Sequence, residues 1–350
     1  MRHLKMIAAA VATACLSMGA HADIKNVDIY GVVAFGLMST EGADGHKNNE
    51  VLNESRIGFK GSKELKSGPK FIWQIETGFI GPNGLTARTY ESGTFGTRDT
   101  WAGFEGSMGK VRVGRLVTPF GETLDWPYAN GGVGPIVEAT TVPGGGSFVR
   151  LSDQIRYDSP QLGPFTGSIS VGRGDRVIPV GQQSNVWNDF EVRNSSVVSG
   201  MGHLALGPVT LHAGLESNRK RSAVSDSTNY LVGFETPIVG GLSAYGVWMR
   251  GKSELRSDLG TATKGDYTRN TYQLAAVYKM EDWIFKVTHA KNADLKGPVT
   301  DKGGSLTAVQ ALTFLDPSLV VFGRYVKNHD IKNTGWWNKS RVLLGLEYYF

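Results

Sequence analysis

Cysteine is almost absent from this 350-residue chain, since the single one, Cys15, lies in an N-terminal segment that we expect to be removed. The exported chain would then form no disulfide, so its stability must have another source. Long apolar runs are also missing: no stretch after residue 22 reaches the ~18 apolar residues of a membrane-spanning helix. Charged residues make up 20 % of the chain, which argues against a bundle of apolar membrane helices.

Motifs of catalysis and of nucleotide binding are lacking as well. The chain has no G-x-S-x-G string, no P-loop and no dinucleotide-binding glycine pattern after a predicted strand. No long Lys/Arg run indicates a nucleic-acid surface. The histidines after residue 22 are scattered without H-x-x-x-H spacing, so they predict no metal site: they are His46, His203, His212, His289 and His329. We therefore expect no enzyme, no cofactor, no metal and no nucleic-acid partner.

The first 22 residues have the form of a secretory signal peptide. Arg2 and Lys5 give a positive start, an alanine-rich apolar stretch follows, and Ala20-His21-Ala22 fits the small-residue cleavage pattern. We expect cleavage after Ala22, which leaves residues 23–350 as the mature protein.

What the chain does contain is glycine, at 46 residues, and a repeated alternation of apolar and polar side chains. Alternation of period two is the signature of a strand with two different faces. It is clearest at the C-terminus, where every second residue is large and apolar: Val342, Leu344, Leu346, Tyr348 and Phe350. Aromatic residues often stand at the ends of these faces, where the interface of a bilayer would hold them.

The connections between these strands alternate between short and long. Short ones include Gly207-Pro208 and Glu281-Asp282, and long polar ones are expected near Ser39–Val51, Asn218–Ser227 and Ser253–Thr268. Short turns at one end and long loops at the other are typical of an outer-membrane barrel. We predict an all-β antiparallel transmembrane barrel of about 16 strands. The alternative is a secreted soluble propeller or sandwich, whose strands also alternate.

One connection interrupts the rhythm, from residue 117 to residue 148. It is rich in glycine and proline, and loops of this length without regular alternation are usually functional. It contains three carboxylates, Glu122, Asp125 and Glu138, and an aromatic group formed by Phe120, Trp126 and Tyr128.

Four motifs in order carry a resemblance to a known family. They are Ser55–Gly61 (SRIGFKG), Arg98 ahead of Trp101–Phe104 (WAGF), Gly109–Arg115 (GKVRVGR) and Arg150–Pro160 (RLSDQIRYDSP), and the chain ends Tyr-x-Phe. With these motifs the mature chain resembles the general porins of Gram-negative outer membranes, most closely the branch that includes the neisserial porins.

This resemblance implies a trimeric 16-stranded barrel in the outer membrane, with its third external loop, residues 117–148, folded into the lumen. In the family that loop presents carboxylates to a ladder of arginines on the barrel wall. Carried over by motif, the ladder here is Arg56, Arg98, Arg150 and Arg156, and the carboxylates come from Glu122, Asp125 and Glu138. The chain lacks the Pro-Glu-Phe-Gly-Gly string of enterobacterial members, which leaves open which acid faces the ladder.

Strand alternation gives an independent prediction for some of these residues. Arg56 alternates with Ile57, so it is expected to point into the lumen. Arg98 is expected to share a lumen face with Thr100 and Ala102, opposite Trp101. His212 is expected to face the lumen, opposite Leu211 and Ala213. Rows of opposite charge across a narrow pore create a transverse field that sorts small polar solutes.

The function predicted from these observations is passive exchange of ions and small hydrophilic solutes through a water-filled pore. The alternative within the same architecture is an outer-membrane channel selective for a sugar or an organic acid. Two further alternatives are a barrel hydrolase, which would need a Ser/His or Asp/His set near one strand end, and an adhesin with a barrel anchor. The expected partners are outer-membrane lipid, two further copies of the chain and the solutes themselves.

Overall fold

A computed structural model of the chain describes residues 27–78, 95–128, 142–145, 150–174, 194–220, 224–329 and 339–350. The predicted signal segment 1–22 and Glu138 lie outside these residues. Among the described residues, no helix is both long and apolar enough to cross a membrane.

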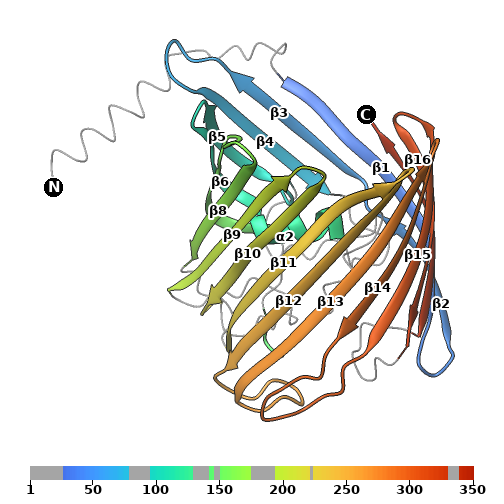
Figure 1. Ribbon diagram of the computed structural model, residues 1–350. Helices are drawn as coiled ribbons and strands as arrows, with labels where there is room; N and C mark the ends of the chain where they lie inside the picture. The colour runs from blue at the N-terminus through green and yellow to red at the C-terminus, as the bar shows by residue number, and fades with distance from the viewer. Residues whose placement is uncertain are drawn as a thin grey trace.

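The described strands form one closed antiparallel barrel (Figure 1). The ring closes where Val32–Glu41 of β1 (Val27–Glu41) pair with β17 (Ser340–Tyr349), in a register that places Phe35 opposite Leu346. At the end of this seam the amide of Gly31 donates to the carbonyl of Phe350 over 2.9 Å. Closure matters because an open sheet edge in hydrocarbon would leave backbone N–H and C=O groups without partners.

The sheet consists of seventeen strand segments that make sixteen barrel strands. The second barrel strand is divided into β2 (Lys47–Asn53) and β3 (Arg56–Lys63), which both pair with β1. At the break, the amide of Ala34 donates to the hydroxyl of Ser55 over 3.0 Å, so a side chain replaces the missing backbone acceptor. The predicted fold of sixteen antiparallel strands is confirmed.

The remaining elements follow in chain order around the ring. They are β4 (Lys70–Gly78), β5 (Thr100–Gly106), β6 (Gly109–Val117), the short helices α2 (Pro119–Thr123) and η2 (Leu124–Tyr128), β7 (Arg150–Asp158), β8 (Phe165–Gly174), β9 (Ser195–Leu206), β10 (Val209–Arg219), β11 (Ser225–Val239), β12 (Leu242–Leu255), β13 (Gly265–Met280), β14 (Trp283–Asn292), β15 (Ser305–Asp316) and β16 (Leu319–Asn328).

Each strand presents one face outward and one face to the lumen. In β8, Ile169 and Val171 are exposed on the outer face, whereas Ser170 between them is buried on the inner face. The predicted C-terminal alternation has the same outcome, because Leu344 and Leu346 face outward and Leu343 is buried. The outer face therefore suits hydrocarbon, and the inner face carries most of the polar groups.

The two ends of the barrel have different connections. Five turns at one end contain only two residues, and in one of them both residues, Gly240 and Gly241, have positive φ, which glycine adopts without strain. At the other end, three of the connections predicted as long polar loops are shorter than expected. Thus β1 reaches Glu41, β10 reaches Arg219 and β12 reaches Leu255, because the polar residues there continue the pairing as extended hairpins.

The orientation of the two faces predicts that an arginine on the outer face of β8 lowers the free energy of unfolding more than an arginine at the adjacent lumen position. Ile169→Arg places a charge on the outer face and should lower the free energy of unfolding from lipid vesicles by about 2–4 kcal/mol if the site is near the bilayer midplane. Ser168→Arg is the matched control, because Ser168 lies on the lumen face, where its hydroxyl already donates to Asp158 over 2.8 Å. Urea unfolding in vesicles measures both; equal destabilisation by the two variants would contradict the assigned faces.

Candidate functional site

The segment after β6 folds inward and packs on the inner face of the barrel. Thr118 caps α2, because its hydroxyl accepts a hydrogen bond from the amide of Gly121 over 3.1 Å. From this helical turn Phe120 and Leu124 project into an apolar cluster, and Tyr128 joins it from the end of η2. The cluster is completed by side chains of the wall: Met201, Leu231, Val247 and Met249. We call residues 118–128 the inward segment; Figure 1 shows α2 inside the ring.

Three hydrogen bonds attach the backbone of the inward segment to the wall. The amide of Phe120 donates to the hydroxyl of Ser199 on β9 over 3.1 Å. Near the other end, Gln273 on β13 donates to the carbonyl of Tyr128 over 2.8 Å, and Lys286 on β14 donates to the carbonyl of Pro127 over 3.3 Å. These bonds satisfy backbone groups that would otherwise be buried without partners, so the segment is held at both ends.

A second described part of the connection, residues 142–145, lies against the extended ends of the strands. Val142 packs in an apolar cluster with Leu255 and Tyr267. The carbonyls of Pro143 and Gly144 accept hydrogen bonds from the hydroxyls of Ser253 (2.6 Å) and Ser225 (2.7 Å). The described parts of the predicted loop 117–148 therefore lie against β9–β14 and their connections.

The wall from β3 to β7 carries paired charges of both signs. Arg98, which precedes β5, pairs with Glu76 on β4. Arg150, at the start of β7, pairs with Asp99 over 2.8 Å. Glu76 also accepts a hydrogen bond from Tyr30 on β1 over 2.9 Å. These side chains are half-buried or buried, so the pairs are less screened by solvent than pairs on an open surface.

The inward segment meets this charged wall at Arg156. Its guanidinium contacts Glu122 on α2, donates to Asp158 over 2.8 Å and donates to the carbonyl of Val117 over 3.0 Å. The second oxygen of Asp158 accepts a hydrogen bond from Arg112 over 2.7 Å. Arg156 is buried whereas the Glu122 side chain is 59 % exposed, so the carboxylate lies at the boundary between the wall and the open lumen.

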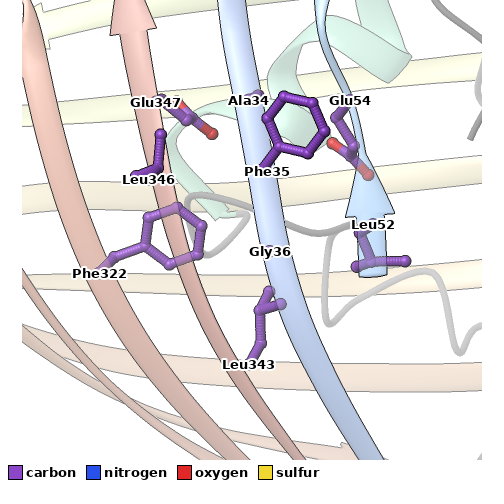
Figure 2. A pocket seen from close by; sticks show the side chains of 9 residues that line it. All are labelled: Ala34, Phe35, Gly36, Leu52, Glu54, Phe322, Leu343, Leu346 and Glu347. Atoms are coloured by element: carbon purple, nitrogen blue, oxygen red, sulfur yellow. The ribbon is translucent and has the colours of Figure 1, made fainter. Parts of the chain in front are cut away.

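Arg56 lies on the lumen face of β3, opposite Val32 of β1, as alternation predicts. Its side chain makes no hydrogen bond or ion pair with any described residue, but it lies within electrostatic range of Glu54 at the β2–β3 break. Glu54 is also within electrostatic range of Arg98 and of Arg324 on β16. Figure 2 shows Glu54 and Glu347 on either side of β1, around a small gap where Ala34 and Gly36 carry little side chain. We call the charged lumen residues from β16 to β7 the charged belt: Arg324, Glu347, Glu54, Arg56, Glu76, Arg98, Asp99, Arg112, Arg150, Arg156 and Asp158.

The predicted carboxylates of the long connection have different positions. Glu122 contacts one predicted arginine, Arg156, whereas Asp125 is exposed on η2 without a described partner. Glu138 lies outside the described residues. Arg98 and Arg150 are paired instead with carboxylates of the wall, Glu76 and Asp99.

One orientation predicted from the sequence is wrong. Trp101 faces the lumen, opposite Gln74 in the β4–β5 register, and the Arg112 guanidinium lies 5.1 Å from the centre of its ring. Thr100 and Ala102 therefore lie on the outer face. Arg98 nevertheless reaches the lumen, because it precedes β5 and its direction is not set by the alternation of that strand.

Several residues of the site were not identified from the sequence. Asp99, Asp158 and Arg112 pair with or contact the predicted arginines, and Asp158 could have been found because it lies two residues after Arg156 on the same face of a strand. Between Gly114 and Leu116 the β6–β7 register shifts, and Asp153 has φ of 61°. Such irregularities change which residues face inward, and alternation does not reveal them.

The charged belt and the inward segment both contribute side chains to the lumen. The belt carries charges of both signs, and Glu122, Asp125 and Trp126 are exposed on the segment. A lumen lined in this way can lower the barrier for a hydrated ion or a small polar solute, because water and fixed charges replace hydrocarbon along the path.

The docking of the inward segment predicts a strong effect of one methyl group. A Cβ at Gly233 would collide with the hydroxyl of Tyr128 and lie 2.8 Å from the carbonyl oxygen of Gly246. Gly233→Ala should therefore displace Tyr128, destabilise the barrel by about 1–3 kcal/mol and change the open-channel current. The matched control is Gly200→Ala, whose Cβ would lie 3.7 Å from its nearest neighbour, the carbonyl oxygen of Ser168. Thermal unfolding and bilayer recordings test both; indistinguishable variants would contradict the docking.

Comparison with known sequences places this geometry in a family. A family model described as Gram-negative porin matches residues 8–313. A chitoporin of Vibrio furnissii is 29 % identical over 317 residues, which cover 83 % of each chain. The major outer membrane protein P.IB of Neisseria meningitidis serogroup A is 32 % identical over 183 residues, which cover 48 % of this chain and 50 % of that protein.

Solved structures share the fold at low sequence identity. An anion-selective porin from Comamonas acidovorans superposes with a TM-score of 0.71 at 18 % identity, covering 93 % of this chain and 99 % of that one. OmpF from Salmonella typhi gives 0.68 at 14 % identity, covering 93 % and 98 %. The resemblance derived from the four sequence motifs is therefore confirmed. The chain belongs to the Gram-negative porin family and is a channel of the outer membrane.

Proposed function

We propose that ions and small hydrophilic solutes pass through this channel between the charged belt and the inward segment, which together form its constriction. The observation that carries the proposal is the contact of Glu122 with Arg156, because it joins the inward segment to the wall at the margin of the lumen. Arg56, Arg98 and Arg150 supply positive charge along the same wall. Glu122 and Asp125 supply negative charge from the segment, and Glu138 is proposed to belong with them.

The proposed transport is passive and needs no cofactor or covalent step. The mature protein would be a single barrel of residues 23–350, released by cleavage after Ala22, with residues 117–148 as the constriction loop. We also propose a homotrimer in outer-membrane lipid. Support for this assembly comes from OmpT of Vibrio cholerae, a structural neighbour at a TM-score of 0.63 that is described in a trimer form.

Neutralising the belt should change the ion preference of the pore. With Arg56→Gln, Arg98→Gln and Arg150→Gln combined, the permeability ratio should move about two- to fivefold toward cations, because fixed positive charge is lost from the wall. The reversal potential in a planar bilayer under a salt gradient measures the shift.

The matched control for this experiment replaces the same three arginines by lysine, which keeps the charge but not the planar hydrogen-bonding geometry. Glu122→Gln should shift the ratio in the opposite direction. A folded glutamine variant with an unchanged reversal potential would rule out the belt as the filter. A protein that never raises bilayer conductance would refute the channel itself.

A second candidate function is selective passage of a sugar. It is favoured by the chitoporin relative and by Trp126, whose side chain is 73 % exposed on η2. Trp126 is thus available to stack on a sugar ring, whereas Tyr128 is completely buried and is not.

If the channel selects sugars, chitin oligosaccharides should block the ion current in a saturable manner, and Trp126→Ala should weaken that block by about tenfold or more. The control is Asp125→Asn, which leaves the indole in place. Concentration-dependent current noise in single-channel recordings provides the measurement. A linear, unsaturable response in the wild type would leave general diffusion as the function.

A further inference from the structure

Two histidines outside the charged pairs of the belt meet beneath the inward segment. His203 on β9 and His212 on β10 lie directly opposite each other in the hairpin register. Their Nδ1 atoms are 2.7 Å apart, and the centres of their rings are 5.0 Å apart. His212 is buried on the lumen face, as predicted, but its pairing with His203 was not predicted from the sequence.

This histidine pair supports the end of the inward segment. The ring of Tyr128 meets the ring of His212 edge to face, with centres 5.8 Å apart. On its other side Tyr128 lies against Gly233, where even a methyl group would collide with its hydroxyl. Because Tyr128 is completely buried between these contacts, a shift of the His212 ring has to displace Tyr128.

Charged and titratable groups face the pair from each element packed against it. On β11, Glu235 lies 3.5 Å from Nε2 of His212. Glu122 of α2 and Arg156 of β7 act electrostatically on His203. Tyr128 of η2 and Tyr245 of β12 both lie within electrostatic range of Glu235, and the ammonium of Lys286 on β14 lies 5.7 Å from the centre of the Tyr245 ring. Glu216, four residues after His212 on the inner face of β10, is completely buried.

Two ring nitrogens of the neutral pair carry no hydrogen, so the pair can gain two protons. In the neutral pair one ring donates its Nδ1–H to the bare Nδ1 of the other, so one hydrogen occupies the 2.7 Å gap. A first added proton goes to the remaining bare Nε2 and leaves this bond intact, and Glu235 is placed to stabilise positive charge on His212. A second added proton puts two hydrogens in the same gap, which breaks the bond and sets two positive rings against each other.

We infer that His203 and His212 are positioning residues for the inward segment, and that acidification releases the segment by breaking their hydrogen bond. The inference rests on the proposed function, since it assigns a regulation to the constriction. Release of Tyr128 lets η2 move away from the wall and into the lumen, so the ionic current should fall. Histidine is suited to this role because each ring can gain a proton and a positive charge on acidification.

The test is the pH profile of the single-channel current. For the wild type, the mean current should be about twofold or more lower at pH ~3 than at pH ~7.5, because the second proton has to enter a buried pair that already carries one positive charge, and the change should reverse on return to neutral pH. With His203→Gln, or with His203→Gln and His212→Gln together, this component of the profile should disappear. Glutamine keeps a donor and an acceptor but does not titrate, and the single variant leaves the buried ring of His212 in place.

A second histidine pair provides the matched control. His289 on β14 and His329 just after β16 lie on either side of the Thr307 hydroxyl, 3.1 and 3.0 Å from it, and both are exposed, separated from β10 by at least three intervening strands. His289→Gln with His329→Gln should leave the wild-type pH profile unchanged. If this control pair abolishes the acid response and the His203 variant does not, the inference is wrong.

Hydrogen exchange separates movement of the segment from a simple change of charge in the pore. The amide of Phe120 donates to the wall, and the amide of Gly121 donates to the Thr118 cap of α2. The protection of both, corrected for intrinsic rates, should fall about tenfold or more on acidification in the wild type but not in His203→Gln. Unchanged protection would overturn the inference even if the current responds to pH. A barrel with no current at any pH would instead count against the proposed function.

Discussion

The pairing of the first strand with the last is the interaction on which the rest of the structure depends. The β1–β17 seam turns a long sheet into a ring, and only a ring satisfies every backbone donor and acceptor in a medium without water. No disulfide within the chain contributes, because the sequence contains a single cysteine, Cys15. Where the second barrel strand is interrupted, at Glu54–Ser55, the backbone donor is still satisfied, because the amide of Ala34 donates to the Ser55 hydroxyl.

Once the ring is closed, the inner wall is divided into two regions with different tasks. From β16 through β7 the wall exposes charge, and the carboxylates and guanidinium groups there are mostly paired with each other. From β9 through β14 it is covered by the inward segment, which is held by apolar packing and by three backbone hydrogen bonds. The Arg156–Glu122 contact lies where the two regions meet, so the position of the segment and the charge of the wall are coupled.

The sequence predicts this molecule well wherever a strand is regular. The alternation around Arg56, His212 and the C-terminal strand assigns faces that the structure confirms, because a period of two leaves no other choice. It fails for Trp101, because a large aromatic residue was assigned to lipid whereas here it packs beneath a guanidinium in the lumen. The contacts of Glu122 and of the histidine pair could not be predicted either, since they depend on where α2 docks and on hairpin register.

The closed seam also places the start of β1 and the end of β17 on neighbouring strands. Val27 and Phe350 lie at the short-turn end of neighbouring strands, and the Gly31–Phe350 hydrogen bonds join those strands near that end. For the finished ring, any of the two-residue turns is geometrically equivalent to this junction. The sheet therefore does not specify which strand begins the polypeptide, and a circularly permuted gene that opens one of those turns and links the present termini would encode the same barrel.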